Sequence, residues 1–336
     1  MSIKNVFVIG GTGFVGPPLI QQLTKCGHDV TYLHRGETHD SRTDGAREVI
    51  ADRKDESRLA AAIAMSKPDI VVDMIPFTAD DALAVRRACC DSVQRIVALS
   101  SIDVYLAFGR IHETEPGPVQ PTPLTELSSL RQTNQPGGPT CDKIAVEQTY
   151  LSEVSPPATI LRLPAIYGAR DKYRRLRGYL KRMDDGRPFI LLGESIAKWK
   201  FSRGYVENVA HAISLAVQQD CAAGEIYNVA EPQAMTEADL VHTIARTTGW
   251  QGDVITLPDG YLPEYLKPKV NFAQDWEVCT RKIREQLGYS EIVNSATAFE
   301  RTVDWERSSP PEAEPFEYDD RLEDQAFEAA ATSDRT

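Results

Sequence analysis

The amino-acid sequence predicts an α/β fold in which a doubly wound parallel sheet is followed by a smaller C-terminal lobe. Short β-rich runs alternate with helical patterns through the first half, which is typical of a parallel sheet covered by helices on both faces. Several of these runs are almost continuously apolar, as parallel strands buried on both faces are. The length of 336 residues suits one large α/β domain with an appended lobe.

Five strands and four helices are expected in the first half. The strands are predicted at residues 4–10, 29–34, 69–75, 94–101 and 158–163. The helices are predicted at residues 14–26, 56–66, 79–90 and 143–154. Residues 106–139 break this alternation, because they are rich in Pro, Gly, Thr and Ser and exceed the length of an ordinary connection. We expect this segment to be a substrate lid or a poorly ordered excursion.

The second half is less regular. Its patterns predict a basic helix at residues 171–185, a strand at 188–192, an apolar-periodic helix at 206–218 and a strand at 225–231. Thr236 and Asp239 then have the spacing of a capping box, and the helix they open is expected to end at Gly249.

Composition excludes several classes of protein. The formal net charge of −12 gives no electrostatic support to a general nucleic-acid-binding role. The six cysteines form no CxxC pair and no metal-ligand spacing, so we expect reduced thiols, no metal site and a cytoplasmic location. No stretch approaches the roughly 18 apolar residues of a membrane span, so a membrane is not an expected partner.

A glycine-rich turn lies between the first predicted strand and the first predicted helix. In the sequence VFVIGGTGFVGPPLIQQL, Gly10 permits a tight turn, Gly13 lets the backbone approach a pyrophosphate, and Gly16 allows the helix to pack closely. The N–H groups of the helix N-terminus then face the phosphates. Pro17 and Pro18 are tolerated in a first helical turn, whose N–H groups have no intrahelical partner. A P-loop is excluded, because no Lys-Ser/Thr pair follows Gly16.

The end of the second strand predicts which dinucleotide is bound. An acid at this position bonds the ribose 2′-hydroxyl of NAD, whereas an arginine accommodates the 2′-phosphate of NADP. The chain has His34 and Arg35 here and no acid at the strand end. These residues favour NADP over NAD, with a solvated surface charge at Arg35 as the alternative interpretation.

Together with the glycine turn, three further motifs carry a resemblance to a known family. These are ALSSIDVY (98–105), CDKIAVE (141–147) and LRLPAIYG (161–168). The chain resembles the extended short-chain dehydrogenases/reductases, and more closely the NAD(P)-dependent epimerase/dehydratase group with its atypical members. The resemblance covers about residues 3–250, and residues 201–217 match the family's later strand-and-helix block.

The resemblance implies a division of the chain. Residues 1–164 with about 205–235 would form a Rossmann-type dinucleotide-binding domain, and about 165–204 with 236–310 a substrate lobe. Residues 311–336 would be an acidic C-terminal tail. This tail could be disordered, but Phe316, Tyr318, Leu322 and Phe327 indicate that part of it packs.

The resemblance also implies roles for individual residues. The pyrophosphate would be held by Gly10, Thr12, Gly13, Phe14, Val15 and Gly16. His34 and Arg35 would lie beside the adenosine ribose, and Asp52 would contact the adenine. The remaining cofactor contacts would come from Met74, Ile75, Pro76, Lys143, Pro164 and Ile166, with Lys143 on the nicotinamide ribose. Ser101 matches the family's catalytic Ser/Thr.

The tyrosine of the family's Tyr-x-x-x-Lys pair is missing, because Pro139 occupies its position four residues before Lys143. In the family, the lysine lowers the pKa of this tyrosine so that it can exchange a proton with the substrate. Tyr105, Tyr167 or Cys141 could act instead, or Ser101 and Lys143 could support a chemistry without a phenol. The competing interpretations are packing residues for the two tyrosines, a buried thiol for Cys141 and a strand-end cap for Ser101.

Residues 169–183 are strongly basic in an otherwise acidic chain. In extended family members the second lobe holds a nucleoside-diphosphate sugar, so these cations could contact a diphosphate. A solvated helix is the alternative interpretation.

Two hypotheses of function follow. The first is an NAD(P)-dependent oxidoreductase or epimerase that acts on a small molecule, either a sugar nucleotide or a related hydroxy/keto compound. The second is a non-catalytic NADP(H)-binding sensor or an RNA- or protein-binding regulator, since the chloroplast stem-loop-binding proteins are similar atypical relatives. The net charge of −12 argues against the RNA version. A homodimer is left open.

Overall fold

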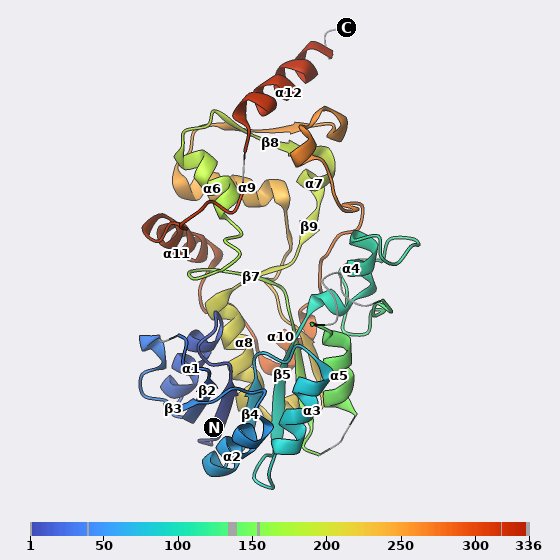
Figure 1. The fold of residues 1–336 in the computed structure, drawn as a ribbon. Helices are drawn as coiled ribbons and strands as arrows, with labels where there is room; N and C mark the ends of the chain where they lie inside the picture. The colour runs from blue at the N-terminus through green and yellow to red at the C-terminus, as the bar shows by residue number, and fades with distance from the viewer. Residues whose placement is uncertain (1, 39, 134–139, 153–154, 317, 334–336) are drawn as a thin grey trace.

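A central parallel sheet forms the lower half of the molecule in Figure 1. The computed structural model describes residues 2–38, 40–133, 140–152, 155–316 and 318–333. The sheet has seven strands in the order β11-β6-β5-β4-β1-β2-β3, and every neighbouring pair is parallel. Its strands are β1 (Asn5–Ile9), β2 (Asp29–His34), β3 (Arg47–Ile50), β4 (Ile70–Asp73), β5 (Arg95–Ser101), β6 (Ala158–Leu163) and β11 (Ile226–Asn228).

Helices cover both faces of this sheet. One face packs against α1 (Gly16–Lys25) and α8 (Val206–Gln218), and the other against α2 (Glu56–Ser66), α3 (Ala79–Ala88) and α5 (Lys143–Leu151). Residues of β1 divide between the two cores, since Val6 and Val8 face one and Phe7 and Ile9 the other. This two-sided burial explains the nearly continuous apolar runs of the strands. The predicted doubly wound parallel sheet is confirmed.

The five predicted strands of the first half are all present, and the structure adds β3. Its sequence REVI is only half apolar, and three of its four residues are exposed at the edge of the sheet. Neither an alternating nor a continuous apolar pattern marks it, so the sequence gives no strand signal. The predicted helix at 143–154 ends at Leu151 within the part that the structure describes.

A second lobe lies above the sheet in Figure 1. It contains α6 (Arg177–Asp184), β8 (Phe189–Gly193), α7 (Glu194–Lys198), α9 (Glu237–Thr248), β13 (Asp253–Leu257), α11 (Ser295–Ser308) and α12 (Asp320–Ser333). Two short strands lie between it and the sheet in Figure 1, β7 (Ala165–Tyr167) and β9 (Lys200–Phe201). The strand β10 (Arg203–Tyr205) pairs with β7, and β12 (Met235–Thr236) pairs with β9. The helix α10 (Arg281–Leu287) packs beside β11.

The predicted helix at residues 171–185 is wrong in its first half. Arg170 and Arg174 have positive φ angles of 74° and 46°, which an α-helix does not allow. The carboxylate of Asp171 accepts hydrogen bonds from the backbone N–H groups of Tyr173 and Arg175, and so stabilises a turn. The helix therefore begins only at Arg177. By contrast, the capping box of Thr236 and Asp239 and the helix end at Gly249 are confirmed.

Much of the predicted excursion at residues 106–139 is ordered against the rest of the molecule. The helix α4 (Leu106–Ile111) opens it, and Leu124 pairs with Val278. Phe108, Leu124 and Trp276 belong to one buried cluster. The helix and the paired residues are short, so the high content of Pro, Gly, Thr and Ser in this segment hid them from the sequence-based prediction. Residues 134–139, which include Pro139, lie outside the described residues.

The C-terminal tail packs on the second lobe, as its aromatic residues predicted. Phe327 of α12 lies against Phe189 of β8, with the two ring centroids 5.1 Å apart. Ala326 and Ala330 on the same helix share a buried cluster with Leu191. Leu322, in contrast, is 37% exposed. Within the described ranges, no helix is both long and apolar enough to cross a bilayer.

Candidate functional site

The turn between β1 and α1 has the geometry of a phosphate-binding loop. Gly10 adopts a positive φ of 86°, which a residue with a side chain rarely takes. A Cβ atom at Gly16 would collide with the backbone of Gly11, so glycine is required for the first turn of the helix to pack here. At Gly13, by contrast, the nearest atom to an added Cβ is the Gly10 oxygen at 3.7 Å. The surface at Gly13 is therefore open to a ligand.

A further glycine, which the motif spacing did not single out, lies in the same turn. A Cβ at Gly11 would come within 2.7 Å of the Tyr32 Cβ on β2 and 2.8 Å of Ile20 on α1. Gly11 therefore lets the helix, the turn and the second strand approach one another. The two consecutive glycines, Gly10 and Gly11, were the sequence signal that could have indicated this close packing.

A pocket of about 460 Å³ opens in front of this turn, a size within the range of small-molecule sites. Seven of the predicted cofactor residues line it: Gly10, Thr12, Gly13, His34, Arg35, Asp52 and Ile75. It lies at the carboxyl ends of β1, β2 and β4, where open α/β sheets bind their ligands. A glycine turn, a helix N-terminus and a pocket of this size fit a dinucleotide.

The remaining predicted cofactor residues are not among those that line the pocket. Val15 and Gly16 are buried at the start of α1, and Phe14, Met74 and Ile166 pack against the core. Pro164 is buried near Gly204. Pro76 contributes its carbonyl group to Lys143.

The pocket contains the two residues predicted to distinguish the cofactor, His34 and Arg35, and the residue predicted to contact adenine, Asp52. His34 is buried, and its Nε2 lies 2.7 Å from a carboxylate oxygen of Glu48. Arg35 is 61% exposed and donates a hydrogen bond to Glu37 at 2.8 Å. Asp52 accepts a hydrogen bond from the backbone N–H of Lys54. Arg35 therefore presents its guanidinium at the mouth of the pocket.

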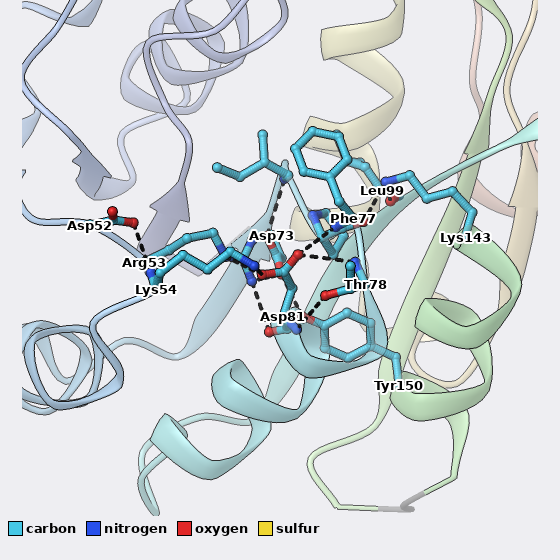
Figure 2. A network of polar contacts seen from close by, with 12 residues as sticks. Asp52, Arg53, Lys54, Asp73, Phe77, Thr78, Asp81, Leu99, Lys143 and Tyr150 are labelled. Carbon is cyan, nitrogen blue, oxygen red and sulfur yellow. Dashed lines mark hydrogen bonds and ion pairs between the residues drawn. The ribbon is translucent and has the colours of Figure 1, made fainter. Parts of the chain in front are cut away.

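A network of polar contacts borders the pocket (Figure 2), and its members Arg53, Lys54 and Asp81 line the pocket directly. Arg53 makes a two-pronged contact with Asp73, with N–O distances of 2.6 and 3.0 Å, and both side chains are buried. The Tyr150 hydroxyl donates to the same carboxylate at 2.6 Å. Lys54 donates to Asp81 at 2.6 Å, and Asp81 also caps α3. The prediction missed these residues, because they are far apart in the sequence.

Lys143 stands at the start of α5 with its amino group buried between two strand ends. Its Nζ donates to the carbonyl oxygens of Pro76 at 2.6 Å and Leu99 at 3.1 Å. It also lies 5.2 Å from the ring centroid of Phe77, which lines the pocket (Figure 2). Burial lowers the pKa of this amino group. These contacts hold Lys143 next to the pocket that the glycine turn opens.

Ser101 and Asp103 lie at the end of β5. The Ser101 Oγ accepts a hydrogen bond from the backbone N–H of Asp103 at 3.3 Å, which is the capping role considered for it. The carboxyl group of Asp103 also bonds to Ser101 and interacts electrostatically with Lys143, Arg131 and His112. Burial raises the pKa of Asp103. The prediction missed Asp103, although its position two residues after Ser101 was a usable signal.

The two tyrosines considered as replacements for the missing one are both buried. Tyr105 donates to Asn228 at 2.6 Å and accepts from Arg162 at 3.0 Å, and burial raises its pKa to about 12. Tyr167 donates to Glu231 at 2.7 Å, and burial raises its pKa as well. Their hydroxyl groups are engaged in the interior, an arrangement that favours the packing interpretation for both.

Cys141 is half-buried near Lys143, and burial raises its pKa. A raised pKa disfavours the thiolate, which is the reactive form of cysteine. This environment therefore favours the interpretation of Cys141 as an ordinary thiol. In the described part of the chain, no group of three or more His, Cys, Asp or Glu side chains is placed to hold a metal ion.

The fold and the pocket together define a dinucleotide-binding protein of the Rossmann type. The model of the NAD dependent epimerase/dehydratase family matches residues 6–230. The chain belongs to this family, and the predicted resemblance is confirmed.

Individual relatives and one solved structure support this placement. The chain is similar to 2'-dehydrokanamycin reductase of Streptomyces kanamyceticus, with 27% identity over 270 residues that cover 78% of this chain and 72% of the reductase. It is also similar to the chloroplast stem-loop binding protein of 41 kDa b of Arabidopsis thaliana. The identity is 23% over 262 residues, which cover 74% of this chain and 64% of that protein.

Among solved structures, the chain is similar to a UDP-glucose-4-epimerase from Stenotrophomonas maltophila, whose crystal structure contains NAD and formylated UDP-arabinopyranose. The TM-score is 0.71, with 21% identity, and the match covers 91% of this chain and 98% of that one. At this identity the similarity shows that the fold is shared.

Proposed function

We propose that this protein is an NAD(P)-dependent oxidoreductase or epimerase that acts on a sugar nucleotide or a related hydroxy/keto compound. One observation carries the proposal: the glycine turn opens onto a pocket lined by His34, Arg35 and Asp52, with Lys143 fixed beside it. The family membership of residues 6–230 supports it.

The residues present would hold the dinucleotide along the carboxyl ends of the sheet. Gly10 to Gly16 would bind the pyrophosphate through backbone N–H groups, and Asp52 would contact the adenine. Lys143 would bind the nicotinamide ribose; two of its three N–H donors are already engaged by Pro76 and Leu99. The bound cofactor would supply or accept the hydride.

NADP is the proposed cofactor, with NAD as the alternative. The exposed guanidinium of Arg35 has room to turn from Glu37 toward a 2′-phosphate, for which bidentate contacts are well suited. Arg35→Ala should weaken NADPH binding about tenfold or more and leave NADH binding nearly unchanged. Calorimetric titration of both coenzymes tests this expectation. An equal loss for the two coenzymes would contradict the role proposed for Arg35.

Proton exchange with the substrate needs a group other than the missing tyrosine. Ser101 and Lys143 remain the residues that we propose to contact the reacting part of the substrate. Tyr105 was also a candidate, but its buried hydrogen bonds to Asn228 and Arg162 favour a positioning role over proton transfer. Asp103 is the stronger candidate, because its carboxyl group bonds to Ser101 and its raised pKa suits a proton donor.

The decisive experiment measures hydride transfer. Purified protein is mixed with NADPH or NADP⁺ and a panel of keto and hydroxy compounds, and the absorbance of the reduced nicotinamide is followed. Turnover that is lost in Lys143→Met supports the proposal. Tight dinucleotide binding without turnover on the whole panel would instead favour a non-catalytic sensor or regulator. Pro139 at the tyrosine position and the similarity to a stem-loop binding protein motivate that second candidate.

A further inference from the structure

The arginines of the second lobe are neutralised from within the chain. All seven arginines between residues 165 and 204 form an ion pair with a carboxylate. The basic segment is thus neither a solvated helix nor a set of uncommitted cations. A diphosphate could be bound here only after some of these pairs were broken.

The C-terminal segment, defined as residues 314–316 and 318–333, supplies the partners of three of these arginines. Arg177 donates to Glu314 at 2.9 Å. Arg182 pairs with Glu323. Arg187 donates to Asp324 at 2.8 Å. Three successive guanidinium groups on one side of the lobe are therefore held by one segment of chain.

The central pair of this set is shielded from water. The side chain of Arg182 is 4% exposed and that of Glu323 is 0% exposed. Glu323 also accepts a hydrogen bond from the Tyr265 hydroxyl at 2.6 Å. Moving Arg182 to an incoming ligand would leave the buried carboxylate of Glu323 with only its longer contact to Arg187, at 3.9 Å, which is unfavourable.

The same segment forms part of the wall of a cavity that Arg182 borders. A pocket of about 270 Å³ lies between α6, β8 and α7. Phe316 and Tyr318 form part of its wall, and the Arg182 guanidinium lies 4.7 Å from the Tyr318 ring centroid. The remaining volume is below the roughly 300–1,000 Å³ of typical ligand pockets.

Apolar contacts keep the segment in place. Ala326 and Ala330 of α12 are buried against Leu191 and neighbouring residues, and Phe327 packs on Phe189. Figure 1 shows α12 at the far end of the second lobe, next to β8. The segment is thus anchored by a helix and does not depend on its ion pairs alone.

We propose that the C-terminal segment is a built-in occupant of the second lobe, so that the substrate is a hydroxy or keto compound without a nucleoside diphosphate. This inference rests on the proposed function, because it names the substrate class of the same site. It selects the non-nucleotide alternative from the two substrate classes proposed above.

Calorimetry on the full-length protein tests the inference, with NADPH, UDP and UDP-glucose as separate probes. The expected result is saturable binding of NADPH and no saturable binding of UDP or UDP-glucose at millimolar concentration. Saturable one-to-one binding of UDP-glucose to the unaltered protein would overturn the inference. Absence of NADPH binding would instead count against the proposed function, so the two failures are distinguishable.

A pair of variants shows whether the segment is the cause. Ala326→Asp puts a charge into the buried face of α12 and should release the segment, exposing Arg177, Arg182 and Arg187. UDP binding should then become measurable, at least about tenfold tighter than the limit for the unaltered protein. Ala329→Asp makes the same substitution at an exposed position of the helix and should leave UDP binding undetectable.

Retained NADPH binding shows that each variant is folded. If Ala326→Asp does not fold, the double variant Glu314→Gln/Asp324→Asn removes two counter-ions and leaves the apolar contacts intact. UDP binding that stays undetectable in a folded variant with the segment released or its carboxylates neutralised would overturn the role assigned to the segment.

Discussion

At the scale of single residues, the site combines open backbone with buried charge. Gly13 offers an unobstructed surface in the phosphate-binding turn, whereas Lys143 is held by two carbonyl groups beneath the pocket. Asp103 adds a carboxyl group with a raised pKa beside Ser101. Each of these features can be tested by a substitution that changes charge with little change in shape.

Gly13→Asp should abolish dinucleotide binding. The nearest atom to an added Cβ is 3.7 Å away, so the side chain fits and the effect is one of charge. A carboxylate about 4 Å from a phosphate costs about 4 kcal/mol at the effective dielectric near a protein surface, or about 10³-fold in affinity. The isosteric Gly13→Asn separates the charge from the bulk of the new side chain and should lose less affinity. Calorimetry that finds unchanged affinity in Gly13→Asp would rule out a phosphate at this turn.

Asp103→Asn should reduce turnover and raise stability at neutral pH. Because burial raises the folded-state pKa of Asp103, its ionisation destabilises the folded protein as pH rises above the ordinary value of 3.8. The stability advantage of the variant should therefore be absent below that pH and grow until the pH exceeds the folded-state pKa. Thermal melts across pH and steady-state kinetics measure the two effects. A destabilised variant at neutral pH would mean that the charged carboxylate is structural.

At the scale of elements, the charged wall of the pocket connects parts of the sheet that are distant in sequence. Arg53 follows β3, Asp73 ends β4, and Tyr150 lies on α5. The pairing of Arg53 with Asp73 therefore fixes the edge strand relative to the centre of the sheet. Because β3 itself is short and largely exposed, this contact matters for its position.

Asp73→Asn should destabilise the protein by about 3 kcal/mol, because it removes the two-pronged partner of the buried Arg53 guanidinium and leaves only the longer contact with Asp81 at 3.5 Å. The double variant Arg53→Met/Asp73→Asn should recover part of this loss. Urea unfolding of the single and double variants gives the coupling energy directly. A coupling energy near zero would contradict a tight buried pair.

The sheet and its turn were predictable at this scale, whereas the wall of the pocket was not. Short β-rich runs, several of them almost continuously apolar, marked β1, β2, β4, β5 and β6, since each strand carries its own burial pattern in successive residues. The edge strand β3 lacks that pattern. The helix at 171–185 was misplaced because side-chain hydrogen bonds from Asp171 override the local helical pattern.

At the scale of the whole molecule, the parallel sheet carries a second lobe against which the C-terminal segment packs. The pocket at the sheet retains about 460 Å³, whereas that of the second lobe retains about 270 Å³. The two halves therefore differ in the ligands they can accept. Ligand-induced stabilisation distinguishes them in one measurement.

NADPH at 100 times its Kd should stabilise the protein by about 2.7 kcal/mol, through binding to the folded state alone. The melting temperature should rise by several degrees, and the shift should disappear in Gly13→Asp. UDP-glucose at the same concentration should produce no shift. A rise in melting temperature with UDP-glucose and none with NADPH would contradict both the proposed dinucleotide site and the exclusion of nucleoside diphosphates from the second lobe.

The sequence by itself determined the family, the parallel sheet and the glycine turn that we propose to bind phosphate. Their signals are local, since glycine spacing, apolar runs and caps lie within a few successive residues. Only the tertiary structure decided that Tyr105 is buried and that the basic segment is neutralised. Arg177 meets Glu314 across 137 positions and Arg182 meets Glu323 across 141, and no local pattern encodes which charges meet over such separations.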